Sequence, residues 1–341
     1  MTDGSATLSA TLSATVDSIA ALQQPGGMIL RAAGGLADPW THVEAAMALT
    51  VGGRRAEAER AYEWLASSQR ADGAWSQYYR ADGGVEVDLL DANFTAYVAT
   101  GVWRHFVATG DAGFLAAMWP VVDRAMAFVA GLQAPGGEIR WARHADGTPW
   151  PYALLTASSS TYLSLRCAAA IADRLGAEER ASVLAAAAGA VADAIVHRPW
   201  SFLPKHRWAM DWYYPVLVGV AGAERLAHGW PRFVIDGWGV RCVDDRPWVT
   251  AAETCEAAMA YLAVGEREAA ARLFSWVHRL RAADGSYFTG RVAPGGATFP
   301  AGERTTYSSA AVVLAADALA GGCELVTLGR ARARATVTGS E

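Results

Sequence analysis

The sequence has little charge for its length and no long uninterrupted apolar run. Charged residues make up 18% of the 341 positions, against about 25% in an average globular domain. This deficit predicts a large interior and excludes a mostly disordered chain. The net charge is −5 and no basic run occurs, so a nucleic-acid-binding surface is not expected. No segment approaches the roughly 20 consecutive apolar residues of a membrane-spanning helix.

Cysteine is also scarce. The four cysteines lie far apart, and no two form a Cys-x-x-Cys pair. The sequence therefore predicts neither a disulfide framework nor a zinc ribbon, and we expect no metal and no cofactor. Residues 1–14 are rich in Ser, Thr and Ala and lack the basic and apolar parts of a secretion signal. From these absences we expect a soluble cytoplasmic protein.

Aromatic residues, by contrast, are abundant, with 14 Trp and 11 Tyr. Many stand beside Gly, Asp or Pro in loops, a pattern more typical of a lined pocket than of a core. The candidates for pocket walls are Trp40, Trp75, Trp103, Trp150, Trp208 and Trp248. Trp103 lies several turns into a predicted helix, so core packing is the better interpretation for it.

Two kinds of helical segment alternate along the chain, and strand signals are weak. Six segments open with polar and aromatic residues and then become small and apolar; they begin at Pro39, Asp88, Thr156, Met210, Thr250 and Glu303. Six more charged helices are predicted near residues 8–23, 54–69, 112–133, 177–197, 222–233 and 266–281. Short turns follow the apolar segments, whereas long Gly- and Trp-rich loops follow the charged ones.

This alternation predicts an all-α protein, an (α/α)6 barrel (toroid) of six helical hairpins. Small apolar residues suit inner helices that have neighbours on every side. We expect one domain over residues 1–322, with disorder at residues 1–7 and in a C-terminal tail over residues 323–341. The polar starts of the inner helices would share one end of the barrel, where six positive helix-dipole ends favour carboxylates or a bound anion.

Two segments resemble glucoamylase-like six-hairpin glycosidases. Residues Asp91–Val129 (DANFTAYVATGVWRHFVATGDAGFLAAMWPVVDRAMAFV) look like their second hairpin, and Thr298–Leu319 (TFPAGERTTYSSAAVVLAADAL) is similar to their final inner helix. The resemblance implies a carbohydrate-active enzyme, and most directly a glycoside hydrolase. The chain is short for a glucoamylase and shows no accessory β-domain, so we expect a small or terminal sugar unit as substrate. A sugar epimerase or an unsaturated-uronyl hydrolase on the same barrel fits nearly as well.

A second resemblance is to terpene cyclases and protein prenyltransferases, which are also helical toroids. Their Gln-x3-Gly-x-Trp repeat appears at residues 69–75, with degraded copies at 23–27, 133–137 and 281–285. The motif is structural and ties an outer helix to the following loop. The acidic motif of the cyclases and the zinc ligands of the prenyltransferases are missing, so an isoprenoid-binding enzyme is the alternative function. A non-catalytic sugar-binding scaffold is a third possibility.

Glycoside hydrolysis needs two carboxyl groups, one protonated and one ionised. Asp211 lies in an Asp-Trp-Tyr-Tyr-Pro cluster, where apolar neighbours would raise the carboxyl pKa, and we assign it as the general acid. The glycosidase resemblance implies a base near Glu303. Glu253 completes the catalytic set, although a capping box with Thr250 explains it equally well.

The remaining candidates would hold the sugar through hydroxyl hydrogen bonds and aromatic stacking. They are Trp40, His42, Glu44, Trp75, Asp88, Asp91, Asn93, Trp212, Tyr213, Trp248 and Tyr307. Helix capping is the alternative for Glu44 and Asp91, and a backbone carbonyl is the alternative partner for His42. The predicted partner is a small-molecule sugar or glycoside, with an isoprenoid as the second choice.

Overall fold

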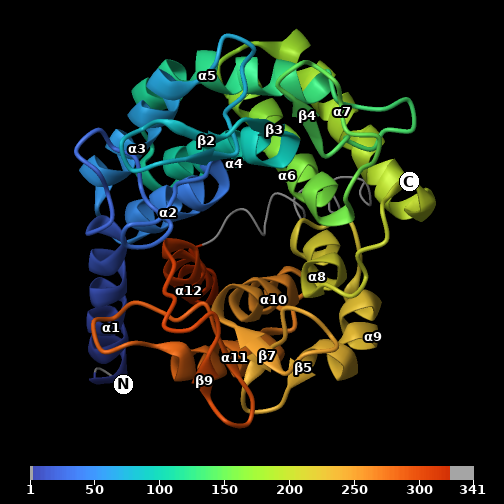
Figure 1. Cartoon of the computed structure of the whole chain (residues 1–341). Coiled ribbons are helices and arrows are strands. Elements are labelled where there is room, and N and C mark those ends of the chain that lie inside the picture. The colour runs from blue at the N-terminus through green and yellow to red at the C-terminus, as the bar shows by residue number, and fades with distance from the viewer. Residues whose placement is uncertain (1–2, 323–341) are drawn as a thin grey trace, which may run out of the picture.

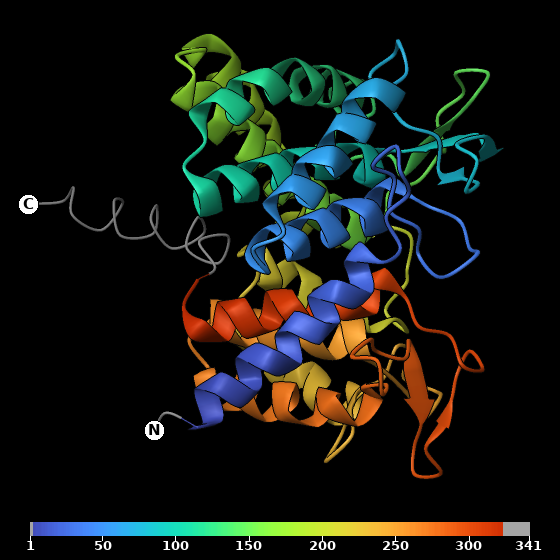
Figure 2. The same ribbon diagram turned by 90° about the vertical axis from the view of Figure 1, so that its left-hand side faces the viewer.

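The computed structural model describes residues 3–322, which form a ring of helices with short strands gathered at one end (Figures 1 and 2). The helices are α1 (Asp3–Ala20), α2 (Pro39–Val51), α3 (Arg55–Ser68), α4 (Ala92–Thr109), α5 (Ala112–Ala130), α6 (Leu155–Arg174), α7 (Glu178–His197), α8 (Ala209–Leu217), α9 (Ala223–Phe233), α10 (Ala251–Ala263), α11 (Arg267–Val277) and α12 (Thr306–Ala320). The strands are β1 (Tyr78–Tyr79), β2 (Val85–Val87), β3 (Leu89–Asp91), β4 (Ala142–His144), β5 (Val234–Ile235), β6 (Gly239–Val240), β7 (Trp248–Thr250), β8 (Gly290–Val292) and β9 (Ala297–Thr298). Two 3-10 turns, η1 (Pro199–Ser201) and η2 (His278–Leu280), follow α7 and α11.

The even-numbered helices form a closed inner ring. Each packs against the next, and α12 packs against α2 to complete the circle. The odd-numbered helices lie outside, joined to the inner ones by the alternating short and long connections (Figure 1). The predicted all-α (α/α)6 barrel is thus confirmed.

The inner helices are built from small residues because they meet neighbours on every side. In α2, every residue from Pro39 to Thr50 is buried. Gly101 of α4 shows how closely these helices approach. A Cβ atom there would lie 2.6 Å from a Val43 methyl group and 2.8 Å from the Tyr62 hydroxyl.

Two outer helices, α5 and α7, are long and apolar enough to cross a membrane by composition alone. Both belong to the barrel, since α5 packs against α4 and α6, and α7 packs against α6. In the folded barrel 44% of the apolar window of α5 and 28% of that of α7 is buried.

The Gln-x3-Gly repeats join neighbouring outer helices, as the structural interpretation predicts. The Gln69 side-chain amide donates to the carbonyl of Gly73 and to that of Val121 on α5, both at 2.9 Å. Gln23 and Gln133 repeat this pattern toward α3 and α7. Gly73 has φ +88°, and a Cβ atom there would lie 2.3 Å from the carbonyl oxygen of Arg124, so glycine is required for the close approach.

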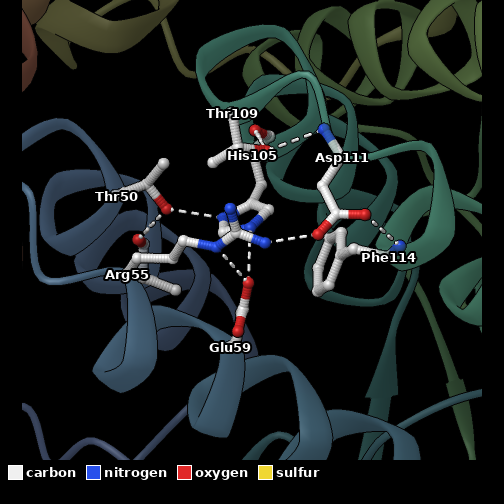
Figure 3. Close-up of polar contacts among 8 residues, drawn as sticks. Thr50, Arg55, Glu59, His105, Thr109, Asp111 and Phe114 are labelled. Carbon is white, nitrogen blue, oxygen red and sulfur yellow. Dashed lines mark hydrogen bonds and ion pairs between the residues drawn. The ribbon is translucent and has the colours of Figure 1, made fainter.

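At the end of the barrel opposite the strands, a polar network fixes the turns of the first two hairpins (Figure 3). Arg55 at the start of α3 binds Glu59 and also Asp111, which caps α5 through the amide of Phe114 at 2.9 Å. The buried His105 ring lies 2.9 Å from the Thr50 hydroxyl. These contacts therefore hold the α2–α3 turn against the α4–α5 turn.

Three details differ from the sequence-based expectations or lie beyond them. The helix predicted from Asp88 begins at Ala92, because Leu89–Asp91 pair with β4 as a strand. The last inner helix begins at Thr306 rather than Glu303, with Thr305 as its N-cap. The disorder predicted for residues 323–341 lies outside the described residues, and that for residues 1–7 stays a prediction.

Candidate active site

The inner helices all begin at the end of the barrel where the long loops and strands lie, which we call the mouth (Figure 2). Four carboxyl groups occupy the starts of four different inner helices. Asp38 and Asp91 are the N-caps of α2 and α4, and Asp211 and Glu253 lie in the first turns of α8 and α10. In the closed ring, α2 lies opposite α8 and α4 lies opposite α10, so carboxyl groups surround the mouth on all sides.

Asp211 is buried, yet it is not the cap of its helix. Its Oδ1 accepts a hydrogen bond from the Thr156 hydroxyl at 2.7 Å. Burial raises the pKa of Asp211, while the bonds from Thr156 and the positive charge of Arg225 oppose that rise. A carboxyl group with a raised pKa, held in one orientation, has the properties of a general acid.

Glu253 occupies the same position in α10 that Asp211 occupies in α8, the third residue after the N-cap. It is half-buried and accepts a hydrogen bond from Thr250, whose hydroxyl does not cap the backbone. The hydrogen bond between the two side chains is not part of a capping box, in which each side chain bonds to a backbone N–H, so the predicted capping interaction of Thr250 is wrong. Because α8 and α10 are neighbours in the inner ring, the two carboxyls lie in the first turns of adjacent helices.

Asp38 and Asp91 form a second acidic group, on the side of the mouth made by α2 and α4. Asp38 accepts the Thr41 amide at 2.8 Å and pairs with Arg31 at 3.4 Å. Asp91 accepts two backbone amides and the indole N–H of Trp141 at 2.6 Å. Burial, with a smaller contribution from the nearby charge of Asp38, raises the pKa of Asp91 to about 6. Both side chains cap a helix, and both also place a carboxyl group at the mouth.

Three aromatic rings fill the barrel axis below these carboxyls. Trp40 stacks on Tyr97 of α4 at 4.1 Å and contacts Tyr214 of α8 at 6.1 Å, measured between ring centroids. The contact with Tyr214 crosses the whole ring, because α2 and α8 are opposite each other. We call these three rings the aromatic layer, and it forms the floor of the mouth.

Two further carboxyl groups lie below the aromatic layer, beside a cavity of about 50 Å³. Glu44 accepts a hydrogen bond from the Tyr97 hydroxyl, and Glu256 accepts one each from Tyr213 and Tyr307. Burial raises the pKa of Glu44 to about 7 and that of Glu256 to about 8. The first-turn capping role expected for Glu44 is wrong, since Asp38 caps α2 and Glu44 lies deeper in the helix.

Several predicted sugar-binding residues have structural partners instead. His42 is fully buried, with the Ile29 amide on one ring nitrogen at 3.1 Å and the Ala61 carbonyl on the other at 2.9 Å. Trp75 is 1% exposed and donates to the Leu65 carbonyl. We therefore no longer assign these two residues to the wall of a pocket.

Trp212 and Tyr213 are also buried. Trp212 stacks on Phe233 of α9 at 5.3 Å, so it lies on the outer side of α8. The Trp212 ring therefore points away from the mouth, and it does not stack over the Asp211 carboxyl group. Tyr213 and Tyr307 converge on Glu256, below the aromatic layer.

The rest of the predicted set lies in the mouth loops or on α4. Asp88 is half-exposed and pairs with Arg70 at 2.9 Å. Asn93 is buried, and its Oδ1 has no hydrogen-bond partner. Glu303 is half-buried and accepts the Thr289 hydroxyl at 2.7 Å, in the loop before α12. Trp248 donates from its indole N–H to the Phe299 carbonyl at 2.8 Å.

Sequence reasoning did not single out Asp38, Tyr97 or Trp141. The Asp-Pro-Trp-Thr segment at residues 38–41 is a clear cap followed by a first-turn proline, and that signal could have identified Asp38. Tyr97 and Trp141 gave no signal, because their roles depend on partners more than 40 residues away. Among residues 3–322, no group of three or more His, Cys, Asp or Glu is arranged to hold a metal ion.

Solved structures share this architecture. The chain aligns with a glycosidase in complex with glucose at a TM-score of 0.75 and 14% identity, covering 94% of this chain and 99% of the other. It aligns with mannosylglycerate hydrolase from Thermus thermophilus in complex with glucose at 0.67 and 13%, covering 89% and 99%. A sugar epimerase from a ruminal bacterium gives 0.66 and 12%, covering 91% and 96%. These structures show that the chain has the helical-barrel fold shared by glycosidases and a sugar epimerase.

One curated relative identifies the family. No family model matches the chain. Over 309 residues the chain is 48% identical to the MMP endo-(1,4)-3-O-methyl-alpha-D-mannosidase of Mycolicibacterium hassiacum, covering 89% of this chain and 85% of the relative. The chain belongs to the family of this mannosidase.

Proposed function

We propose that the protein hydrolyses α-(1,4) bonds within a polymer of 3-O-methylated mannose. The observation that carries this proposal is the 48% identity to a relative named for that activity, over nearly the whole length of both chains. The closed barrel supplies a deep mouth with several carboxyls, as hydrolysis of a glycosidic bond requires. The substrate class in this proposal is a sugar. The alternative class is an isoprenoid, and a binding assay with both kinds of ligand would distinguish the two.

In this proposal Asp211 is the general acid and Glu253 is the general base. Asp211 gives its proton to the oxygen of the bond that breaks, while Glu253 takes a proton from the water that attacks the sugar carbon on the opposite face. A separation of about 6.5–9.5 Å between the two carboxyl groups leaves room for the attacking water and gives inversion, whereas about 5–5.5 Å gives retention. Because Glu253 activates a water in this proposal, the first product should have inverted anomeric configuration.

Glu303 is the alternative base, since the final inner helix follows it. Its carboxylate is bonded to Thr289 in the loop, one inner helix further from Asp211 than Glu253 is. The two candidates are separated by substitution. Glu253→Gln should lower kcat by about 10²–10⁴-fold, whereas Glu303→Gln should change it by less than tenfold. The reverse result would transfer the role of base to Glu303.

The sugar next to the bond would lie on the aromatic layer. Trp40 offers ring surface, and Asp91 with Asn93 offers hydrogen-bonding groups to hydroxyls. The unpaired Oδ1 of Asn93 supports this role, because a buried amide oxygen without a partner costs about 1–3 kcal/mol.

The first experiment incubates the purified protein with 3-O-methylated α-(1,4)-mannose oligosaccharides and follows the products by mass spectrometry and NMR. Internal cleavage yields a spread of shorter oligosaccharides, whereas action on a terminal unit yields monosaccharide from the start. Loss of turnover in Asp211→Asn and Glu253→Gln, with folding retained, supports the assignment. No cleavage of any mannoside by the wild-type protein would refute the proposed substrate.

The proposed site of action is the cytoplasm. Fractionation of cells that produce the protein from its own gene would test this, and recovery in the medium or the membrane fraction would refute it.

A further inference from the structure

Large apolar side chains that face solvent are concentrated at the mouth. Eight such side chains are exposed among the described residues, and six of them lie in the loops at that end: Val85, Val87, Trp200, Leu203, Trp208 and Phe299. The other two, Val183 and Val196, lie on α7. Apolar groups exposed together on one face of a soluble protein mark a binding surface.

The loop between α5 and α6 carries the first aromatic platform. Trp141 stacks on Tyr152 at 6.1 Å with 10° between the ring planes, and Trp150 packs against both at 5.1 and 5.4 Å. All three rings are half-buried. The indole of Trp141 is fixed by its hydrogen bond to Asp91, so the platform is held in position beside the carboxyls of the mouth.

The second platform lies on the opposite side of the mouth. Trp248 on β7 and Phe299 after β9 pack edge to face at 5.1 Å, and Phe299 is 51% exposed. β4, which belongs to the loop of the first platform, and β7 lie on opposite sides of the ring (Figure 1). The two platforms therefore flank the aromatic layer and the proposed catalytic carboxyls.

We propose that these two platforms bind sugar units on either side of the bond that is cleaved, and that they select methylated units. This inference rests on the proposed function. Aromatic faces stack on the C–H surfaces of sugars, and an O-methyl group enlarges the apolar surface that can be buried. A chain held at both sides can be cut only in its interior, so the platforms also account for internal cleavage.

The test compares Trp150→Ala and Phe299→Ala with wild type on 3-O-methylated oligosaccharides of increasing length. Loss of one stacking contact should lower kcat/KM about tenfold for long substrates. The shortest cleaved substrate, which does not reach the platform, should change less than twofold. Trp150→Phe keeps a ring and should restore most of the loss. The matched control is Trp276→Ala, which removes a half-buried Trp from the outer helix α11.

A second readout separates recognition of methyl groups from a structural effect. Wild type should bind the methylated polymer more tightly than an unmethylated α-(1,4)-mannose polymer, measured by calorimetry with the inactive Glu253→Gln variant. Adding Phe299→Ala should reduce that preference. An equal loss of kcat/KM on substrates of all lengths, or an unchanged preference for the methylated polymer, would overturn the inference. The proposed function would still stand if wild type cleaves the methylated substrate. If wild type neither cleaves nor binds the methylated polymer, both fail.

Discussion

The pair of carboxyls below the aromatic layer, Glu44 and Glu256, makes stability depend on pH in a direction that can be worked out. Burial, together with the negative charge of the neighbouring Glu44, raises the pKa of Glu256 from 4.5 to about 8. Between these values the folded protein holds a proton that the unfolded chain has lost. The stabilisation is therefore complete below about pH 4.5 and is lost as the pH rises through about 8.

Replacing Glu256 by Gln tests this effect. A pKa unit corresponds to 1.36 kcal/mol, so the shift sets an upper limit of about 5 kcal/mol on the loss. Gln resembles the protonated carboxyl in shape: its amide can accept a hydrogen bond from one of Tyr213 and Tyr307 and donate to the other. We expect Glu256→Gln to match wild type at pH 5 and to exceed it by a few kcal/mol at pH 9.

The assay is denaturant unfolding of both proteins at pH 5, 7 and 9, with the free energy extrapolated to water. Glu63→Gln, at an exposed position of α3, controls for the loss of one carboxylate from the chain and should follow wild type. A constant difference between wild type and Glu256→Gln across this pH range would refute the reasoning. It would mean that Glu256 is already ionised in the folded protein at pH 5.

Three other outcomes follow from the geometry. Gly73→Ala should destabilise the protein by about 2–5 kcal/mol, because it combines αL strain with a clash against the backbone of α5. Gly83 has a similar φ of +85° but open space around it, so Gly83→Ala should show only the cost of the strain in the same unfolding assay. Asp91→Ala should cost about 1 kcal/mol in thermal unfolding through loss of the α4 cap, while Asp91→Asn should cost less. In a pH–rate profile, activity should fall as the pH rises through the raised pKa of Asp211, and Thr156→Val, which removes a bond that stabilises the carboxylate, should move that fall to higher pH. A shift to lower pH would contradict the role of Asp211 as the acid.

The helices were predictable because their signals are local. Alternating apolar and charged segments and glycine turns mark most of the helices, and side-chain caps begin α2, α4, α5 and α12. The strands escaped prediction because they are two or three residues long and pair between distant loops, as Leu89–Asp91 do with β4. No periodicity can be read from so few residues.

The sequence predicted where the acidic residues of the site would lie, but not the role of each side chain. The sequence placed Asp211 and Glu253 at the starts of inner helices, where the structure has them. It could not tell that His42 on α2 and Trp75 in the loop after α3 point into packed surroundings, because their buried partners Ala61 and Leu65 are 10 or more residues away along the chain. It also gave Glu44 a capping role that belongs to Asp38.

The amino-acid sequence by itself determined a closed ring of six hairpins with acidic and aromatic residues at one end, since helix periodicity, turn residues and caps are properties of adjacent residues. The tertiary structure decided which of those residues face one another. It brought Trp40 into contact with Tyr214 across the ring. It also separated the carboxyls of the mouth from Glu44 and Glu256 below, and burial there raised the pKa of both glutamates. Burial and the distance between charges depend on segments that are far apart along the chain, and only the folded barrel brings them together.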